Sequence, residues 1–192
     1  MIMDPLDATS YRPCFGISGK AFSGKSTWAL EIAKQAVGMQ VLSFAGELKR
    51  HVQEIFDVPV HGPDKNRELL QRFGTEWCRS VDEDVWVKAL LRDWRKRGRP
   101  PCVVDDVRFP NEFKALRGAG FIMVRLACGE DVRAKRAAKL GAQLPPAHPS
   151  ETALDLETRW NFIFTTDRMT MREVRQEAKN LLYKAWLLKV GN

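Results

Sequence analysis

Short apolar runs alternate along the chain with longer stretches in which apolar residues recur at helical spacing. Five apolar runs predict β-strands, and they span residues 14–18, 40–44, 102–104, 121–126 and 162–165. Strands that alternate with helices are typical of a parallel sheet covered on both faces. The pattern therefore predicts an α/β protein of three layers with a mostly parallel five-stranded sheet.

Two capping boxes predict where helices begin. Ser80 with Glu83 precedes an apolar stripe that ends near Gly98, and Thr170 with Glu173 opens a final helix. The helical stripes carry large aromatic residues that we assign to the core, namely Trp86, Trp94 and Trp186.

The spacing of these elements predicts one folded domain with two excursions. Residues 1–11 have no periodicity and are expected to be a flexible leader, so the domain comprises residues 12–192. Nearly sixty residues separate the second and third strands, enough for a substrate-binding helical insertion at about residues 45–98. A basic helix followed by Pro145, Pro146 and Pro149 predicts a mobile lid at about residues 130–152.

The composition favours a soluble globular protein. Of 192 residues, 44% are hydrophobic and 29% are charged, and there is neither a membrane-spanning apolar run nor a signal peptide. We therefore expect a cytoplasmic location and no membrane partner. The four cysteines are widely spaced without a CxxC pair, which argues against a disulfide framework or a zinc site.

The net charge of +7 is compatible with nucleic acid, an anionic membrane surface or the phosphates of a small ligand. The basic residues are scattered through helical segments, and no nucleic-acid-binding motif is present. We therefore expect no stable nucleic-acid partner.

A phosphate-binding motif gives the most specific signal. Residues 19–26, here called the phosphate loop, read GKAFSGKS and fit G-x-x-x-x-G-K-[ST] between a predicted strand and a predicted helix. In such a loop Lys25 reaches the β and γ phosphates and the Ser26 hydroxyl holds Mg²⁺. The motif predicts ATP or GTP binding, with the phosphates contacted by Gly19, Ala21, Phe22, Ser23, Gly24, Lys25, Ser26 and Thr27.

The third predicted strand leads into a pair of acids and an arginine. Asp105 and Asp106 follow its apolar run, and in a parallel sheet an acid at this position faces the same crevice as the phosphate loop. One of them is a candidate for the magnesium site, while the other can be explained as a helix cap. Arg108 would face the same crevice and suits a second phosphate.

Three further segments carry a resemblance to a family. They are residues 67–76 (RELLQRFGTE) with Arg79, residues 106–112 (DVRFPNE) and residues 148–151 (HPSE). Together with the phosphate loop, and in this order, they resemble the deoxynucleoside monophosphate kinases of bacteriophages over about residues 14–167. The resemblance implies a phosphate-loop fold with a monophosphate-binding insertion and a lid, located in the host cytoplasm if the chain is phage-encoded.

The resemblance also implies a reaction. ATP with Mg²⁺ would phosphorylate a deoxynucleoside 5′-monophosphate to the diphosphate for DNA precursor synthesis. Ser26 and Asp106 would hold the metal, and the acceptor would be bound by Lys49, Arg67, Gln71, Glu76, Arg79 and Arg108. His148, Ser150 and Glu151 match the family without an assigned role. Adenylate kinases have the corresponding arginine four residues after the acid, whereas Arg108 is two after Asp106, so the comparison fixes a region and not a geometry.

Phosphoryl transfer between nucleotides depends on positioning and charge neutralisation. We expect Arg133 and Arg136 to close over the phosphates, with a solvated helix face beside Lys135 and Lys139 as the alternative. The predicted catalytic set is Lys25, Asp106, Arg108, Arg133 and Arg136.

Other functions and properties stay open on the sequence alone. A kinase for a nucleoside or a coenzyme precursor is the nearest alternative. A nucleic-acid-dependent ATPase is less favoured, because the third strand ends in Asp-Asp and not in the Asp-Glu of a water-activating motor. The accepted bases and a homodimeric state also stay open.

Overall fold

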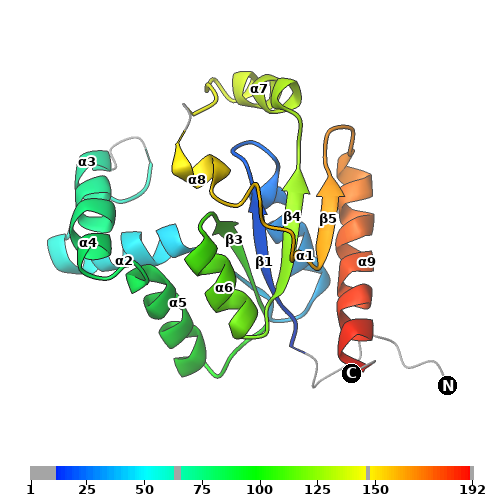
Figure 1. Cartoon of the computed structure of the whole chain (residues 1–192), viewed down its shortest axis with the longest axis horizontal. Coiled ribbons are helices and arrows are strands. Elements are labelled where there is room, and N and C mark those ends of the chain that lie inside the picture. The colour runs from blue at the N-terminus through cyan, green and yellow to red at the C-terminus, as the bar shows by residue number, and fades with distance from the viewer. Residues whose placement is uncertain (1–11, 63–65, 146–147, 191–192) are drawn as a thin grey trace. The chain divides into compact units, whose positions relative to one another are not determined.

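The computed structural model describes residues 12–62, 66–145 and 148–190. The chain forms two compact units (Figure 1). The core unit comprises the chain up to Val41 together with the chain from Pro100 onward, and the helical unit comprises Leu42–Arg99. The predicted leader, residues 1–11, lies outside the described residues.

A five-stranded sheet is the centre of the core unit. Its strands are β1 (Cys14–Gly19), β2 (Gln40–Leu42), β3 (Cys102–Val107), β4 (Ile122–Ala127) and β5 (Phe162–Thr165). They lie in the order β2-β3-β1-β4-β5, with β1 parallel to β3 and β4, and β4 parallel to β5. The prediction of a mostly parallel five-stranded sheet is confirmed.

Two strands, β2 and β3, end more than one residue away from their predicted ends. β2 ends at Leu42 because the Ser43 side chain accepts a hydrogen bond from the Gly46 backbone N–H and begins a helix at Phe44. β3 continues through both predicted acids to Val107. The pair Asp105 and Asp106 therefore belongs to the strand itself.

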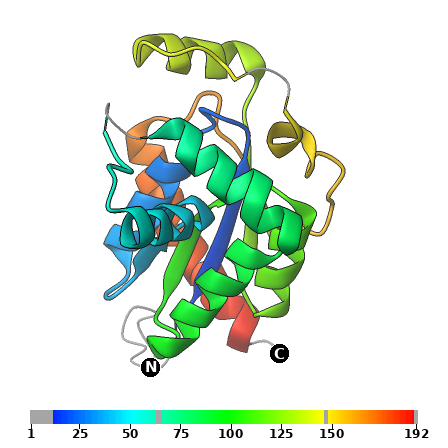
Figure 2. The same cartoon turned by 90° about the vertical axis from the view of Figure 1, so that its left-hand side faces the viewer.

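Helices cover both faces of the sheet, which gives the predicted three layers. The core unit contains α1 (Lys25–Gln35), α6 (Pro110–Gly118), α7 (Glu130–Lys139), α8 (Pro149–Thr152) and α9 (Met171–Val190). On one face, Phe15 and Ile17 of β1 pack with Trp28 of α1 and Leu181 of α9. On the other face, Gly16 approaches Leu116 of α6. Figures 1 and 2 show α7 beyond the carboxyl ends of the strands and α8 beside the same end of the sheet.

The capping box predicted for the last helix is confirmed. The Glu173 carboxylate accepts a hydrogen bond from the Thr170 N–H at 2.7 Å, and the Thr170 hydroxyl accepts one from the Glu173 N–H at 3.3 Å. α9 begins directly after, at Met171. Trp186 on this helix is only half-buried, whereas Trp86 and Trp94 are buried as predicted.

The helical unit contains α2 (Phe44–Phe56), α3 (Arg67–Gln71), a π-helical segment η1 (Arg72–Cys78), α4 (Arg79–Val81) and α5 (Val85–Lys96), all visible in Figure 2. Gly74 lets η1 approach Leu48 of α2, because a side chain on Gly74 would lie 2.6 Å from Leu48 Cδ2. The buried Trp86 indole donates a hydrogen bond to the Gly74 carbonyl at 3.1 Å. The unit therefore has its own core.

The capping box predicted for α5 is wrong. Ser80 lies inside α4, where its hydroxyl donates to the Trp77 carbonyl at 2.8 Å. Asp84 is instead the residue that precedes α5, and its N–H donates to the Asp82 carboxylate at 3.0 Å. A serine inside a helix bonds the preceding turn in this way.

No helix in the described part of the chain is both long enough and apolar enough to span a membrane.

The contact between Gly16 and α6 predicts a stability effect. A methyl group on Gly16 would lie 2.7 Å from Met123 Cε and 3.1 Å from Leu116 Cδ1. We expect Gly16→Ala to lower the free energy of unfolding by about 1–3 kcal/mol, because overpacking displaces neighbouring side chains. Urea denaturation measures the change.

Gly118→Ala is the matched control. A Cβ at this last position of α6 meets nothing within 4 Å, so the change should leave the stability equal or raise it by up to about 1 kcal/mol. Equal destabilisation by both substitutions would contradict the packing explanation.

Candidate functional site

The phosphate loop forms the turn between β1 and α1. Gly24 has φ of 99°, a conformation that suits glycine, and Phe22 also adopts a left-handed conformation with φ of 62°. A Cβ on Gly19 would lie 2.8 Å from the Leu126 carbonyl oxygen of β4, so the loop can follow this path only with glycine there. Because α1 begins at Lys25, the N–H groups of its first turn have no intrahelical partner and favour an anion.

Lys25 lies inside this turn with its ammonium group buried. The ammonium donates hydrogen bonds to the Gly19 carbonyl at 2.7 Å and to the Lys20 carbonyl at 2.9 Å. Burial, together with the nearby positive charge of Arg108, lowers the pKa of Lys25 to about 8. The site therefore holds a positive charge that is poorly solvated and that a phosphate would stabilise.

The candidate ligands for a metal are Ser26 of the phosphate loop and an acid of β3. The Ser26 hydroxyl donates to Asp105 Oδ2 at 2.8 Å. The sheet register shifts between Gly16 and Ser18, so β3 has one residue more than β1 opposite this span, at the position of the two acids. Both Asp105 and Asp106 act electrostatically on Lys25, and Asp105 is the one that the structure joins to Ser26.

Ser26 and Asp105 fit a magnesium ion. A hydroxyl and a carboxylate are hard oxygen donors, and Mg²⁺ takes few protein ligands beside phosphate oxygens and water. Within the described ranges no group of three or more His, Cys, Asp or Glu side chains gathers as a dedicated metal centre. The phosphates of a nucleotide would have to complete the coordination.

Arg108 is held in place by the helix that follows it. The buried Glu112 carboxylate accepts hydrogen bonds from the backbone N–H of Arg108 at 2.8 Å and of Phe109 at 3.0 Å. Pro110 begins α6 directly after. In the segment DVRFPNE, β3 therefore ends at Val107, Arg108 follows, and Glu112 caps the start of α6. The helix cap expected from one of the two aspartates is instead made by Glu112.

Glu151 is a site residue to which the sequence assigned no role. Its Oε2 accepts a hydrogen bond from the Ala21 N–H of the phosphate loop at 2.7 Å, and its Oε1 forms an ion pair with Arg108 at 2.7 Å. The motif HPSE builds the turn that carries it, since His148 caps α8 by accepting from the Ser150 N–H at 3.2 Å. Glu151 therefore joins the phosphate loop to Arg108.

The basic helix α7 contacts backbone carbonyl oxygens of the phosphate loop, whereas Glu151 contacts a backbone N–H. Arg133 Nη1 lies 3.5 Å from the Ala21 carbonyl oxygen, and Arg136 Nη1 lies 3.3 Å from that of Phe22. Lys135 and Lys139 are exposed, whereas Arg133 is only 7% exposed, so the solvated-face alternative is wrong for Arg133. Closure of these two arginines over phosphates stays a prediction.

Polar contacts from two further segments hold the loop. Asp155, after α8, pairs with Lys20 at 3.0 Å and with Arg125 of β4 at 2.7 Å. The buried Thr166 hydroxyl donates to the Ser23 carbonyl at 2.9 Å. Asp155 is 135 positions from Lys20 in the sequence and Thr166 is 143 positions from Ser23, and no local pattern marks either contact.

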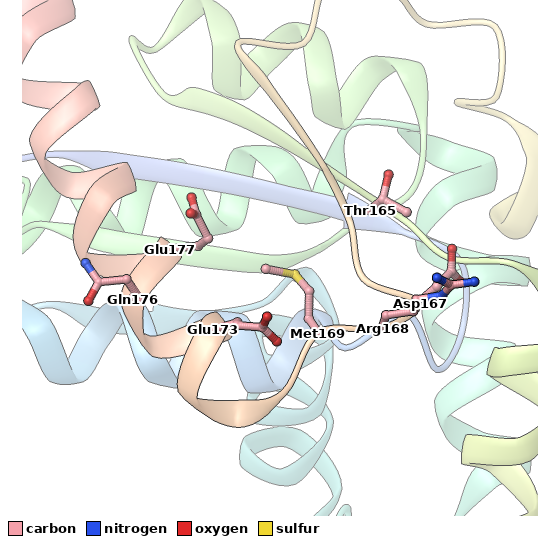
Figure 3. A pocket seen from close by; sticks show the side chains of 7 residues that line it. All are labelled: Thr165, Asp167, Arg168, Met169, Glu173, Gln176 and Glu177. Atoms are coloured by element: carbon pink, nitrogen blue, oxygen red, sulfur yellow. The ribbon is translucent and has the colours of Figure 1, made fainter.

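The core unit contains a cavity of about 440 Å³ (Figure 3). It lies between the end of β5 and the first turns of α9, and it is lined by Thr165, Asp167, Arg168, Met169, Glu173, Gln176 and Glu177. Thr166 lies between the lining residues Thr165 and Asp167 in sequence and bonds the Ser23 carbonyl, so one short segment both lines this cavity and contacts the phosphate loop.

The predicted acceptor residues belong to the helical unit, apart from Arg108. Lys49 lies on α2, Arg67 and Gln71 on α3, Glu76 on η1 and Arg79 on α4. Gln71 and Glu76 are exposed, and Lys49 and Arg79 are half-buried. Their role in binding an acceptor stays a prediction, as does the function of the insertion at about residues 45–98 and of the lid at about residues 130–152.

The helical unit has a cavity of its own, of about 310 Å³. Aromatic and charged side chains line it together, namely His51, Phe73, Trp86, Lys88 and Arg92, with Cys78, Asp82, Val85 and Ala89.

Comparison with known proteins identifies the fold. No protein-family model and no curated protein matches the chain. Among solved structures, a gluconokinase from Sinorhizobium meliloti 1021 is 19% identical, with 95% of this chain and 98% of that chain covered and a TM-score of 0.57. The chain has the fold of a phosphate-loop kinase.

Two shikimate kinases support the same conclusion. The enzyme from Acinetobacter baumannii in complex with shikimate is 14% identical over 94% of this chain and 98% of that chain, with a TM-score of 0.58. The enzyme from Bacteroides thetaiotaomicron is 16% identical over 89% and 98%, with a TM-score of 0.53. At these identities the kinase fold is shared, and the acceptor has to be argued from this chain's own residues.

The buried charge of Lys25 predicts a pH-dependent stability. Its pKa is about 8 in the folded chain and near the ordinary 10.5 when unfolded, so between these values the unfolded state binds more protons and stability rises with pH. Lys25→Met lacks this increment. We expect the wild type to gain up to about 3 kcal/mol relative to Lys25→Met between pH 7.5 and about 10.5, since one pKa unit corresponds to about 1.4 kcal/mol.

Chemical denaturation at several pH values measures both proteins. Lys114→Met is the control, because Lys114 lies on the exposed side of α6. Parallel stability curves for the wild type and Lys25→Met would contradict the lowered pKa.

Proposed function

We propose that this chain transfers the γ-phosphoryl group of ATP, with Mg²⁺, to the phosphate of a deoxynucleoside 5′-monophosphate. The observation that supports this most directly is the position of Arg108. It is fixed at the end of β3 by Glu112 and is joined by Glu151 to the phosphate loop. A guanidinium in this position suits the phosphate of an acceptor next to the phosphates of ATP.

The phosphate loop would bind ATP. Its backbone N–H groups and Lys25 neutralise the phosphate oxygens, and Lys25 would exchange its contacts to the Gly19 and Lys20 carbonyls for a phosphate. The cavity lined by Thr165 and Asp167 (Figure 3) would accept the adenine and ribose, since its volume is about 440 Å³.

Magnesium would be held by Ser26 and an acid of β3 when nucleotide is bound. The hydrogen bond from Ser26 supports Asp105 in this role, while the resemblance of the motif DVRFPNE favours Asp106. The ion would neutralise phosphate charge, and the protein residues orient the groups around it.

Arg133 is well suited to a phosphate. Its guanidinium is buried, and its contacts to the Ala21 carbonyl at 3.5 Å and to the exposed Glu130 at 3.6 Å are long. Its buried Nε has no hydrogen-bond partner among the described residues. Buried donors are normally satisfied, so an anion at the loop would complete this group.

The acceptor would bring a second phosphate to Arg108. Lys49, Arg67 and Arg79 of the helical unit are the further candidates, and the aromatic cavity with Phe73 and Trp86 supports a planar base as the ligand of that unit. The acceptor phosphate is already ionised at neutral pH, so no side chain has to remove a proton from it. Positioning and charge neutralisation by arginines are sufficient for this chemistry.

A second candidate function is phosphorylation of a hydroxyl acceptor. The solved structures named gluconokinase and shikimate kinase share the fold, and this observation favours it. A hydroxyl acceptor needs a general base, for which Asp105 or Asp106 would be available. The acceptor decides between the two functions.

An acceptor panel tests the proposal. ADP release is measured with ATP and Mg²⁺ in the presence of the four deoxynucleoside monophosphates, gluconate, shikimate and dephospho-coenzyme A. We expect turnover only with monophosphates, and Lys25→Ala should abolish it, because the loop lysine neutralises the migrating phosphoryl group. Turnover with only a non-nucleotide acceptor, or ATP hydrolysis that rises on addition of DNA without transfer, would contradict the proposal.

Arg108→Ala separates acceptor binding from ATP binding. We expect the KM for the monophosphate to rise at least about tenfold, a loss of about 1.4 kcal/mol, while the KM for ATP changes less than about threefold. Arg117→Ala, an exposed arginine on α6, is the control. Equal losses for both substrates would place Arg108 outside the acceptor site.

The two acids of β3 can be compared directly. Asp105→Asn should raise the Mg²⁺ concentration for half-maximal activity more than Asp106→Asn, because Asp105 is the acid bonded to Ser26. A magnesium titration of the rate measures both. A larger shift for Asp106→Asn would assign the metal to that residue.

A further inference from the structure

The Glu151 carboxylate occupies a place between two groups that suit phosphate. One oxygen accepts from the Ala21 N–H of the phosphate loop, and the other pairs with Arg108, each at 2.7 Å. Under the function proposed above, on which this inference rests, the first group serves ATP and the second serves the acceptor. A single internal anion therefore joins the two halves of the reaction site.

These contacts have the chemistry of a bound anion. A carboxylate and a phosphate both accept short, charge-assisted hydrogen bonds from N–H groups, and a helix start that follows a glycine-rich turn favours either. The Glu151 side chain is only 11% exposed, so its charge is held largely away from water. Lys25 lies close enough for Glu151 to act on it electrostatically.

The segment after α8 keeps this carboxylate near the loop. Asp155, four residues on, pairs with Lys20 at 3.0 Å and with Arg125 at 2.7 Å. If Glu151 leaves the Ala21 N–H while the Asp155 pairs persist, it stays tethered at a high effective concentration. The contact can therefore be broken and made again without loss of the segment.

We propose that Glu151 is an internal competitor of nucleotide phosphate. Without nucleotide its carboxylate binds the Ala21 N–H of the phosphate loop, and ATP has to displace it. Only a ligand that binds the loop and Lys25 more strongly than one carboxylate does can open the site, which disfavours small anions. Displacement also frees Arg108 from its ion pair. Binding of ATP thus makes Arg108 available to the acceptor phosphate, and the two ligands bind with positive coupling.

Binding of inorganic tripolyphosphate tests the competition. This probe carries the phosphates without base or ribose and needs no acceptor, and calorimetry measures its Kd. We expect Glu151→Gln to bind it at least about fivefold more tightly than the wild type, because a neutral amide competes less well for the N–H and the guanidinium.

Asp131→Asn is the matched control for charge. It removes one exposed carboxylate from the first turn of the same helix α7. We expect less than a twofold change in its Kd. Thermal unfolding first confirms that both variants are folded. Equal tightening in both variants would overturn the inference, because net charge alone would then explain the effect. Weaker binding by Glu151→Gln would overturn it as well.

A second measurement addresses the coupling. In the wild type, a non-hydrolysable ATP analogue should tighten binding of the deoxynucleoside monophosphate, and in Glu151→Gln this effect should fall by at least about threefold because Arg108 is already free. An unchanged coupling would overturn that part of the inference. If neither the wild type nor Glu151→Gln binds tripolyphosphate, the phosphate-binding function itself is contradicted.

Discussion

The unsatisfied N–H groups at the start of α1 are the constraint around which the site is arranged. β1 ends at Gly19 and α1 begins at Lys25, so the chain turns within a few residues and leaves donors that only an anion satisfies well. Glycine at positions 19 and 24 permits that path, and the Lys25 ammonium is buried inside it. The same geometry that strains the backbone and lowers the pKa of Lys25 creates the affinity for phosphate.

The sheet order supplies the remaining charges. Because β1 lies between β3 and β4, the carboxyl ends of both neighbours flank the loop. β3 contributes Asp105 and leads to Arg108, and β4 contributes Arg125, which donates to the Ser18 hydroxyl at 3.0 Å. A parallel sheet thus gathers acids and bases from distant parts of the sequence at one edge.

Patterns local in sequence were sufficient for much of this structure. Apolar runs located all five strands, and the phosphate loop and the box of Thr170 with Glu173 depend on residues within one turn. Ser80 with Glu83 has the same spacing, yet Ser80 belongs to α4 and does not cap α5. The spacing alone does not distinguish a serine inside one helix from a serine that caps the next.

Contacts between distant segments could not be predicted. Glu151 is 130 residues from Ala21, and the motif that contains it gives no sign of a phosphate-like role. The bulge that places Asp105 against Ser26 arises from pairing between strands. Arg133 belongs to a run of basic residues that resembles a solvated face, and only the packing of α7 on the loop buries it.

The ion pairs around α8 differ from the Lys25 site in their exposure to water. Asp155 and Lys20 are each about one-third exposed, as is Arg108, whereas Lys25 is 9% exposed. Mobile ions screen exposed charges over about 8 Å at physiological ionic strength and act far less on buried ones. Dissolved salt would therefore weaken the Asp155 pairs before it weakens the contacts of the loop lysine, and experiments in dilute buffer would exaggerate how firmly these pairs hold Glu151 near the loop.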